Sequence, residues 1–149
     1  MPKTDEKDKQ LLTLLQQNSH ASVQQLAKET GLPPTTVHNR IKKLEQLGVI
    51  KHYTVELDWN KAGKPILAYI LIAAEHILPT GGRVNIEDAA QEIRKLPEVE
   101  ETAILTGGAD LLVRIRAQDI ATLNDLVVRK LRTIAGVDKT QTMIVLSSY

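Results

Sequence analysis

The sequence of 149 residues lacks cysteine, long apolar runs and an excess of either charge. Without cysteine, the chain can form no disulfide, no Cys-ligated zinc site and no thiol nucleophile. Its longest apolar run, residues 65–74, is far too short to span a bilayer. The polar segment MPKTDEKDKQ contains no apolar stretch typical of a signal peptide. We therefore expect a cytoplasmic protein that does not bind membranes.

The small net charge of +1 hides a difference between two parts of the chain. Residues 1–52 contain eight Lys and Arg against five Asp and Glu, a net charge of +3. Residues 53–149 contain 11 against 13, a net charge of −2. A basic segment joined to a mildly acidic one indicates that the N-terminal part binds an anionic partner and the remainder does something else.

Helix signals fill the first fifty residues. Thr4 is placed to cap a leucine-rich first helix. Ser22 and Gln25 form a capping box at the start of a second helix, and Gly31 is placed to end it. Pro34 suits the first turn of a third helix. The buried face of this third helix is predicted by an apolar stripe formed by Val37, Ile41, Leu44 and Leu47.

The second and third helices have the spacing of a helix-turn-helix. That motif needs a small residue where the helices cross, a glycine in the turn and an apolar residue inside the second helix. Ala27, Gly31 and Val37 provide these residues at separations of four and six. We therefore interpret the third helix as a DNA-recognition helix.

Outside its apolar stripe, the third helix carries polar and basic residues. Recognition helices present their N-terminal residues to base edges, whereas cations contact phosphates without reading sequence. The candidates for double-stranded DNA are Thr35, Thr36, His38 and Asn39 at base edges, and Arg40, Lys42, Lys43, Ser22 and Gln24 at the backbone. For any single lysine, a solvated helix face is the simpler interpretation; the whole arrangement favours DNA binding.

The pattern changes after the third helix. The alternating segment at residues 49–58 predicts a strand or wing, and residues 53–64 form the predicted linker. Beyond it, the predicted order is strand, helix, two strands, helix and strand, which is the ferredoxin-like βαββαβ order. The predicted elements are residues 65–74, 86–99, 102–106, 110–117, 119–136 and 139–149. The fold class is therefore α+β, with a winged helix-turn-helix at residues 1–52 and a ferredoxin-like domain at residues 65–149.

The segment TGGADLLV, residues 106–113, has three possible interpretations. A Gly-Gly turn between strands is consistent with a plain hairpin in which Asp110 bonds the loop's own backbone. A phosphate cradle fits worse, because no Lys-Ser/Thr pair and no helix follow the glycines. Exposed backbone N–H groups beside Asp110 also match a zwitterionic amino acid. From the residues alone, the hairpin is the favoured interpretation.

No catalytic or metal site emerges from the sequence. The histidines His20, His38, His52 and His76 are dispersed and lack the spacing of a metal site. No nucleophile–base pattern is present either. We therefore expect no enzymatic activity, no metal and no cofactor.

Four segments together resemble the Lrp/AsnC, or feast/famine, family of transcription regulators. These are DKQLLTLLQQN, SVQQLAKETGLPPTTVHNRIKKLEQLGVIKHYTVELDWNKAGKP, LTGGADLLVRI and VDKTQTMIVLSS. RIKKLEQLGVI and TGGADLLV are the most diagnostic parts. The resemblance implies a sequence-specific DNA-binding regulator that forms homodimers, which assemble into tetramers or octamers. It also implies an amino acid bound between dimers by Thr106, Gly107, Gly108, Ala109, Asp110, Thr140 and Thr142.

Two alternatives to this function remain open. Some relatives with the same two-part layout act as tetrapyrrole (siroheme) decarboxylases, but the basic recognition helix argues against that activity here. A sensor-only corepressor would keep the effector domain and not bind DNA by itself.

Overall fold

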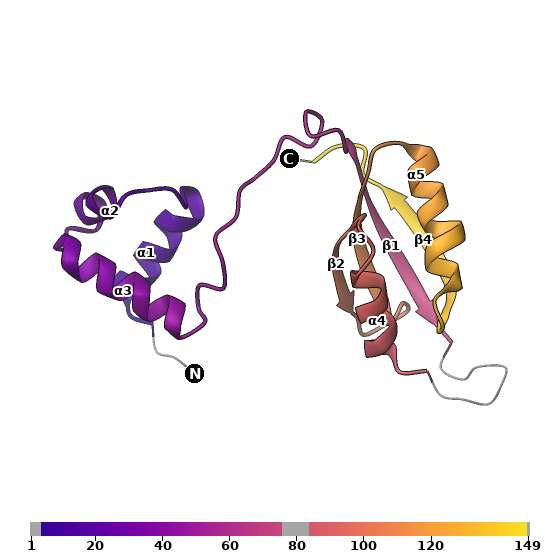
Figure 1. Cartoon of the computed structure of the whole chain (residues 1–149). Helices are drawn as coiled ribbons and strands as arrows, with labels where there is room; N and C mark the ends of the chain where they lie inside the picture. The colour runs from indigo at the N-terminus through magenta and orange to yellow at the C-terminus, as the bar shows by residue number, and fades with distance from the viewer. Residues whose placement is uncertain (1–3, 76–83, 149) are drawn as a thin grey trace. The chain divides into compact units, whose positions relative to one another are not determined.

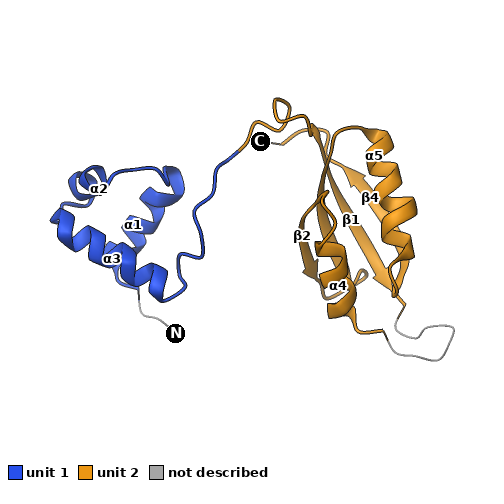
Figure 2. Ribbon diagram, in the orientation of Figure 1, with its two compact units in different colours: residues 1–56 blue, residues 57–149 orange. Residues whose placement is uncertain are grey.

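The computed structural model describes residues 4–75 and 84–148 and divides into two compact units, residues 1–56 and 57–149 (Figure 2). The division falls within the segment predicted as the linker. Most of the segment between the predicted strand at residues 65–74 and the predicted helix at residues 86–99, including His76, lies outside the described residues. In the described part of the chain, no helix is long and apolar enough to cross a membrane.

Unit 1 contains the three expected helices (Figure 1). They are α1 (Glu6–Gln17), α2 (Val23–Thr30) and α3 (Pro34–Gln46). The capping box of Ser22 and Gln25 at the start of α2 is confirmed, because each side chain accepts a hydrogen bond from the other residue's backbone. Gly31 ends α2 with φ of 68°, a left-handed conformation that favours glycine.

The predicted cap of α1 was wrong by one residue. Asp5, not Thr4, is the N-cap, and its carboxylate accepts the backbone N–H of Asp8 at 2.8 Å. The Asp8 carboxylate accepts the backbone N–H of Asp5 in return. A capping box started by Thr4 would need an acceptor at Lys7, and an ammonium group cannot accept.

The core of unit 1 confirms most of the apolar stripe in α3. Leu11, Leu26 and Val37 are fully buried in one cluster, with Ile41 packed at its edge. Leu47 differs from the prediction, since it is the C-cap of α3 and 45% exposed. The predicted strand or wing does not form a strand, because residues 51–58 have no regular secondary structure.

Unit 2 has the predicted ferredoxin-like order. Four antiparallel strands form one sheet in the order β2-β3-β1-β4. The elements are β1 (Ile66–Ala74), α4 (Ile86–Arg94), β2 (Val99–Ile104), β3 (Leu111–Ala117), α5 (Ile120–Asp125), a π-helical turn (Leu126–Lys130), a 3-10 turn (Leu131–Thr133) and β4 (Val137–Ile144).

The last predicted helix, residues 119–136, is interrupted by the π-helical turn. The backbone N–H of Leu131 bonds the carbonyl of Leu126, five residues earlier. A five-residue repeat places both leucines on the same side, and both are fully buried. The π-helical turn therefore lets both leucines enter the core of unit 2.

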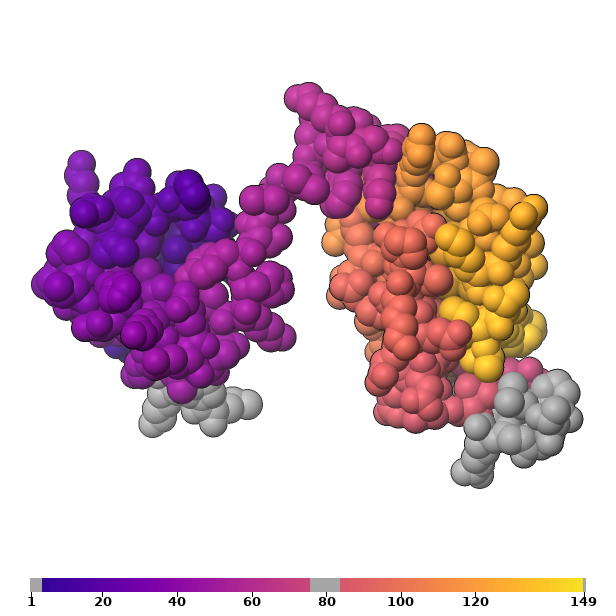
Figure 3. All heavy atoms as spheres, viewed as in Figure 1, coloured from indigo at the N-terminus to yellow at the C-terminus, as the bar shows by residue number. Residues whose placement is uncertain are grey.

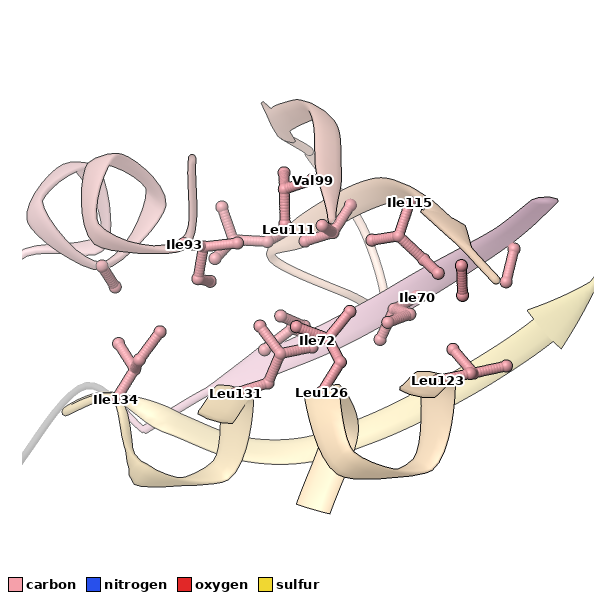
Figure 4. Close-up of a cluster of buried hydrophobic side chains, with 14 residues drawn as sticks. Ile70, Ile72, Ile93, Val99, Leu111, Ile115, Leu123, Leu126, Leu131 and Ile134 are labelled. Atoms are coloured by element: carbon pink, nitrogen blue, oxygen red, sulfur yellow. The ribbon is translucent and has the colours of Figure 1, made fainter. Parts of the chain in front are cut away.

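The helices of unit 2 cover one face of its sheet (Figure 4). Ile70 on β1 pairs with Val113 on β3, and both are fully buried beneath the helices. Alternate residues of β1, including Tyr69 and Leu71, point to the opposite face and are half-buried. Among the described residues, the helices therefore cover one face of the sheet and leave the other without helices.

The start of unit 2 packs against that second face. The turn at residues 58–64 lies against the rest of the unit (Figure 3). Trp59 stacks on the guanidinium of Arg116, with 4.9 Å between the guanidinium carbon and the ring centroid. Arg116 also pairs with Glu100 at 3.1 Å. These contacts fix the point at which the chain enters the sheet.

Candidate DNA-binding and ligand-binding sites

The exposed strip of α3 carries most of the predicted base-reading residues. An α-helix turns by about 100° per residue, so Thr35 and Asn39 lie about 160° around the helix from buried Val37. Both are exposed, and so is His38 on the flank of the strip. Thr36 is less accessible to DNA than these three residues, because it is half-buried. Short hydrogen-bonding side chains at the N-terminal end of the helix can therefore reach the floor of a major groove.

The three cations of α3 differ in their surroundings. Lys42 and Lys43 are exposed, as a phosphate contact requires. The Arg40 guanidinium instead donates from Nη1 to the carboxylates of Asp5 and Asp8, each at 2.7 Å. The bond from Arg40 contributes to holding the pKa of Asp5 below its usual value, after the larger effect of the Asp8 backbone N–H. The phosphate role predicted for Arg40 therefore competes with contacts that it already makes.

The start of α2 exposes two predicted backbone contacts, Ser22 and Gln24. The Ser22 hydroxyl accepts from the Gln25 N–H at 3.2 Å, which uses a lone pair and not its hydrogen. That hydrogen is still able to donate to a phosphate oxygen while the cap is intact.

The TGGADLLV segment forms the plain hairpin at the local level. Leu105 N–H donates to the Asp110 carbonyl at 2.8 Å, and Gly107 has φ of 132°, which favours glycine. Asp110 N–H donates to the carbonyl of Ile72 at 2.9 Å, and its carboxylate accepts the N–H of Ala74 at 2.7 Å. Asp110 thus fastens the loop to β1, a contact that the sequence does not reveal.

A pocket of about 520 Å³ lies beside this hairpin on the face of the sheet without helices. Its floor is Leu71 and Ala73 of β1, and β4 supplies one wall opposite the loop. The lining residues are Leu71, Ala73, Leu105, Thr106, Gly108, Ala109, Lys139, Thr140 and Gln141. Four of the seven predicted effector residues therefore line one pocket.

Lys139 and Gln141 line the pocket but were not predicted from the sequence, where Thr140 and Thr142 of the same strand were predicted instead. Residues in register point to the same face, and Thr140 pairs with buried Ile72, so its side chain faces the helices and Thr140 can border the pocket only through its backbone. Its hydroxyl oxygen is buried without a hydrogen-bond partner among the described residues. Because side chains alternate between the two faces along β4, the neighbours of Thr140, Lys139 and Gln141, must point to the pocket side of the sheet once Thr140 is known to face the helices.

Gly107, Asp110 and Thr142 are not among the lining residues of the pocket. Thr142 pairs with Ile70 and so belongs to the helix-covered side of β4. Lys139 is exposed and brings a positive charge to the pocket. Its ammonium, the Gln141 amide and the loop are suited to a small polar ligand with an anionic group.

Two family models together match most of the chain. Residues 4–51 match a winged helix-turn-helix DNA-binding domain. Residues 73–149 match the Lrp/AsnC ligand-binding domain. The first contains α1 to α3, and the second contains the hairpin, β4 and every residue of the pocket lining except Leu71.

Relatives over the full length are transcription regulators. An HTH-type transcriptional regulator of Pyrococcus furiosus is 36% identical over 94% of this chain and 91% of its own length. The HTH-type transcriptional regulator FL11 of Pyrococcus horikoshii is 35% identical over 97% and 91%. These names describe regulators and not enzymes, so the comparisons do not favour the tetrapyrrole decarboxylase.

Solved structures lead to the same family. A transcriptional regulator of Neisseria meningitidis in complex with L-methionine aligns with a TM-score of 0.87 and 27% identity, over 97% of this chain and 91% of that one. AsnC of Escherichia coli aligns with a TM-score of 0.81 and 26% identity, over 98% and 94%. This chain belongs to the Lrp/AsnC family and is a DNA-binding transcription regulator with that family's ligand-binding domain.

Proposed function

We propose that the exposed strip of α3 reads base edges in the major groove. The observation that carries this proposal is the position of Thr35 and Asn39, which are exposed at the N-terminal end of α3, opposite its buried face. Asn pairs with adenine through two hydrogen bonds, and Thr offers a hydroxyl and a methyl group. Lys42 and Lys43, farther along the helix, bind phosphates.

Two protomers would place two copies of α3 in successive major grooves of a palindromic site. The uncovered sheet face supports pairing through unit 2. Leu67, Tyr69 and Leu71 lie on this face and are only half-buried in the single chain. A second sheet would remove their remaining apolar surface from water. We propose a homodimer built on this face, with tetramers or octamers as higher assemblies.

The pocket beside the hairpin is the proposed effector site, and its ligand is an amino acid. Support comes from the charge of Lys139, which suits a carboxylate, and from the apolar floor of Leu71 and Ala73, which suits a side chain. The related Neisseria meningitidis regulator was solved with L-methionine, which makes methionine the first amino acid to test. A ligand changes DNA binding only if its affinity differs between two assemblies of the protein.

Base reading is tested by selecting a preferred duplex from random DNA with the wild-type protein. Asn39→Ala should lose about 1–3 kcal/mol of discrimination at one base pair of this selected duplex. Gln46→Ala is the matched control, because Gln46 is exposed at the opposite end of α3. Equal weakening by Asn39→Ala on every sequence would contradict base reading.

Effector binding is tested by thermal denaturation with each of the twenty amino acids. Trp59 is the single tryptophan, so its fluorescence follows unit 2. A ligand at one hundred times its Kd should add about 2.7 kcal/mol to the unfolding free energy. Lys139→Gln should weaken this response, whereas Lys95→Gln, outside the pocket lining, should retain it. No response to any of the twenty would contradict the proposal.

A further inference from the structure

Arg40 occupies the core side of α3 and not its exposed strip. It follows Val37 by three residues and precedes Leu44 by four, and both are buried. These spacings place residues on one face of a helix, about 60° from Val37 in the case of Arg40. The side chain of Arg40 is 28% exposed, and its Nε is buried without a hydrogen-bond partner among the described residues.

The two carboxylates that hold Arg40 come from the first turn of α1. Asp5 and Asp8 each accept from Nη1 at 2.7 Å, and the Asp8 side chain is only 6% exposed. A buried carboxylate is tolerated when it is paired, and removing its partner is strongly destabilising. Arg40 therefore cannot turn toward DNA without leaving Asp8 buried and without its cation.

The charge of this cluster also argues against a phosphate contact. Two carboxylates and one guanidinium give a local net charge of −1, whereas a phosphate needs a positive surface. Lys42 and Lys43 have no such acidic neighbours among the salt bridges of the described residues. Of the three cations of α3, Arg40 is thus the one neutralised from within the protein.

The same turn of α1 also holds α2. Lys7 Nζ donates to the carbonyl of Thr30 at 2.7 Å, and Gln10 donates to the carbonyl of Glu29 at 3.3 Å. Both carbonyls belong to the last turn of α2. One short segment, residues 5–10, therefore bonds both the last turn of α2 and the middle of α3, the two helices of the DNA-binding motif.

We propose that Arg40 is a positioning residue, and that its clamp to Asp5 and Asp8 sets the rotation of α3 that presents Asn39 and Lys42 to DNA. The inference rests on the DNA-reading role proposed for α3. The clamp and a phosphate contact predict opposite effects of Asp8→Asn on DNA binding. If Arg40 bound phosphate, Asp8→Asn would release it and strengthen DNA binding; if Arg40 is a clamp, Asp8→Asn weakens specific binding.

The first experiment measures Kd for the selected duplex and for a scrambled duplex over a range of salt concentrations. Asp8→Asn and Arg40→Gln should each lower the preference for the selected duplex at least about fivefold, with the double variant no worse than either. Their salt slopes should stay at the wild-type value, whereas Lys42→Ala lowers the slope by about 0.9. Glu6→Gln is the control: Glu6 lies in the same turn of α1 but pairs with Lys9, so this variant should keep the preference for the selected duplex.

Circular dichroism at the assay temperature selects conditions under which every variant is folded, and Arg40→Lys serves if Arg40→Gln unfolds. A lysine retains the charge but not the planar fork, so it should restore the preference only in part. Stronger binding by Asp8→Asn relative to Glu6→Gln, or a slope loss of about 0.9 in Arg40→Gln, would overturn the clamp and make Arg40 a phosphate contact.

A DNA-free measurement separates this inference from the proposed function. In amide NMR spectra of the full chain, Asp8→Asn should shift resonances along α3, whereas Glu6→Gln should shift only those of α1. Unchanged α3 resonances in Asp8→Asn would refute the clamp, whatever the DNA assays show. Shifted α3 resonances in a protein that prefers no sequence would support the clamp and refute base reading.

Discussion

Replacing Asp110 separates its structural role from its proposed ligand role. Its carboxylate accepts the N–H of Ala74 at 2.7 Å and fastens the hairpin to β1. A hydrogen bond to a charged group contributes about 1.5–3 kcal/mol, and its loss leaves a partly buried amide without an acceptor. Asp110→Ala should therefore destabilise unit 2 by about 2 kcal/mol.

This loss corresponds to a fall of about 8–16 °C in the melting temperature of a domain of this size. Trp59 fluorescence follows the transition, since the single tryptophan lies in unit 2. Asp110→Asn keeps an oxygen acceptor toward Ala74 and should lose less than about half as much. Equal losses in the two variants would refute the hydrogen-bond explanation.

Asp110→Asn also tests whether the carboxylate charge contacts an effector. Asp110 is not among the residues that line the pocket, so the variant should retain the amino-acid response. Loss of the response in a variant of near wild-type stability would instead assign the ligand's ammonium group to Asp110.

Three further predictions concern the fold. Leu126→Ala should destabilise unit 2 by about 2–5 kcal/mol in urea denaturation because Leu126 is fully buried, whereas exposed Val128→Ala should cost less than about 0.5 kcal/mol; equal costs would contradict the π-turn packing. Gly136→Ala should lower the melting temperature by about 4–16 °C, because φ of 91° is strained for alanine; an unchanged value would refute the strain. Burial and the hydrogen bond to Glu45 raise the pKa of Tyr53 to about 12. The contribution of protonated Tyr53 to the stability of the folded protein is therefore complete below pH 10 and is lost as the pH rises toward 12. An ordinary tyrosine pKa in an ultraviolet titration of the wild type would contradict this.

Local signals explain why the helices of unit 1 were predictable. A capping box depends on residues three apart, so Ser22 with Gln25 is readable from the sequence. The same rule explains the error at α1, where Asp5 has an acceptor at Asp8 and Thr4 has only a lysine at the equivalent position. The order of strands and helices along unit 2 was predictable from the alternation of their sequence patterns.

Side-chain partners far apart in the sequence were not predictable. The spacing from Val37 shows that Arg40 lies near the core, but its partner Asp8 is 32 residues away. The face of Lys139 likewise depends on the register between β4 and β1, which alternation alone does not set. The residues themselves predicted the hairpin, the resemblance added an effector to it, and the register was needed to locate the pocket.

We expect an amino acid in the pocket of unit 2 to change sequence-specific DNA binding by α3. This coupling is tested by the Kd of the selected duplex, measured by fluorescence anisotropy with and without a saturating amino acid from the thermal screen. We predict a change of at least about fivefold, with the scrambled duplex bound more weakly throughout. An identical Kd with and without bound ligand, or equal binding of both duplexes, would contradict the claim.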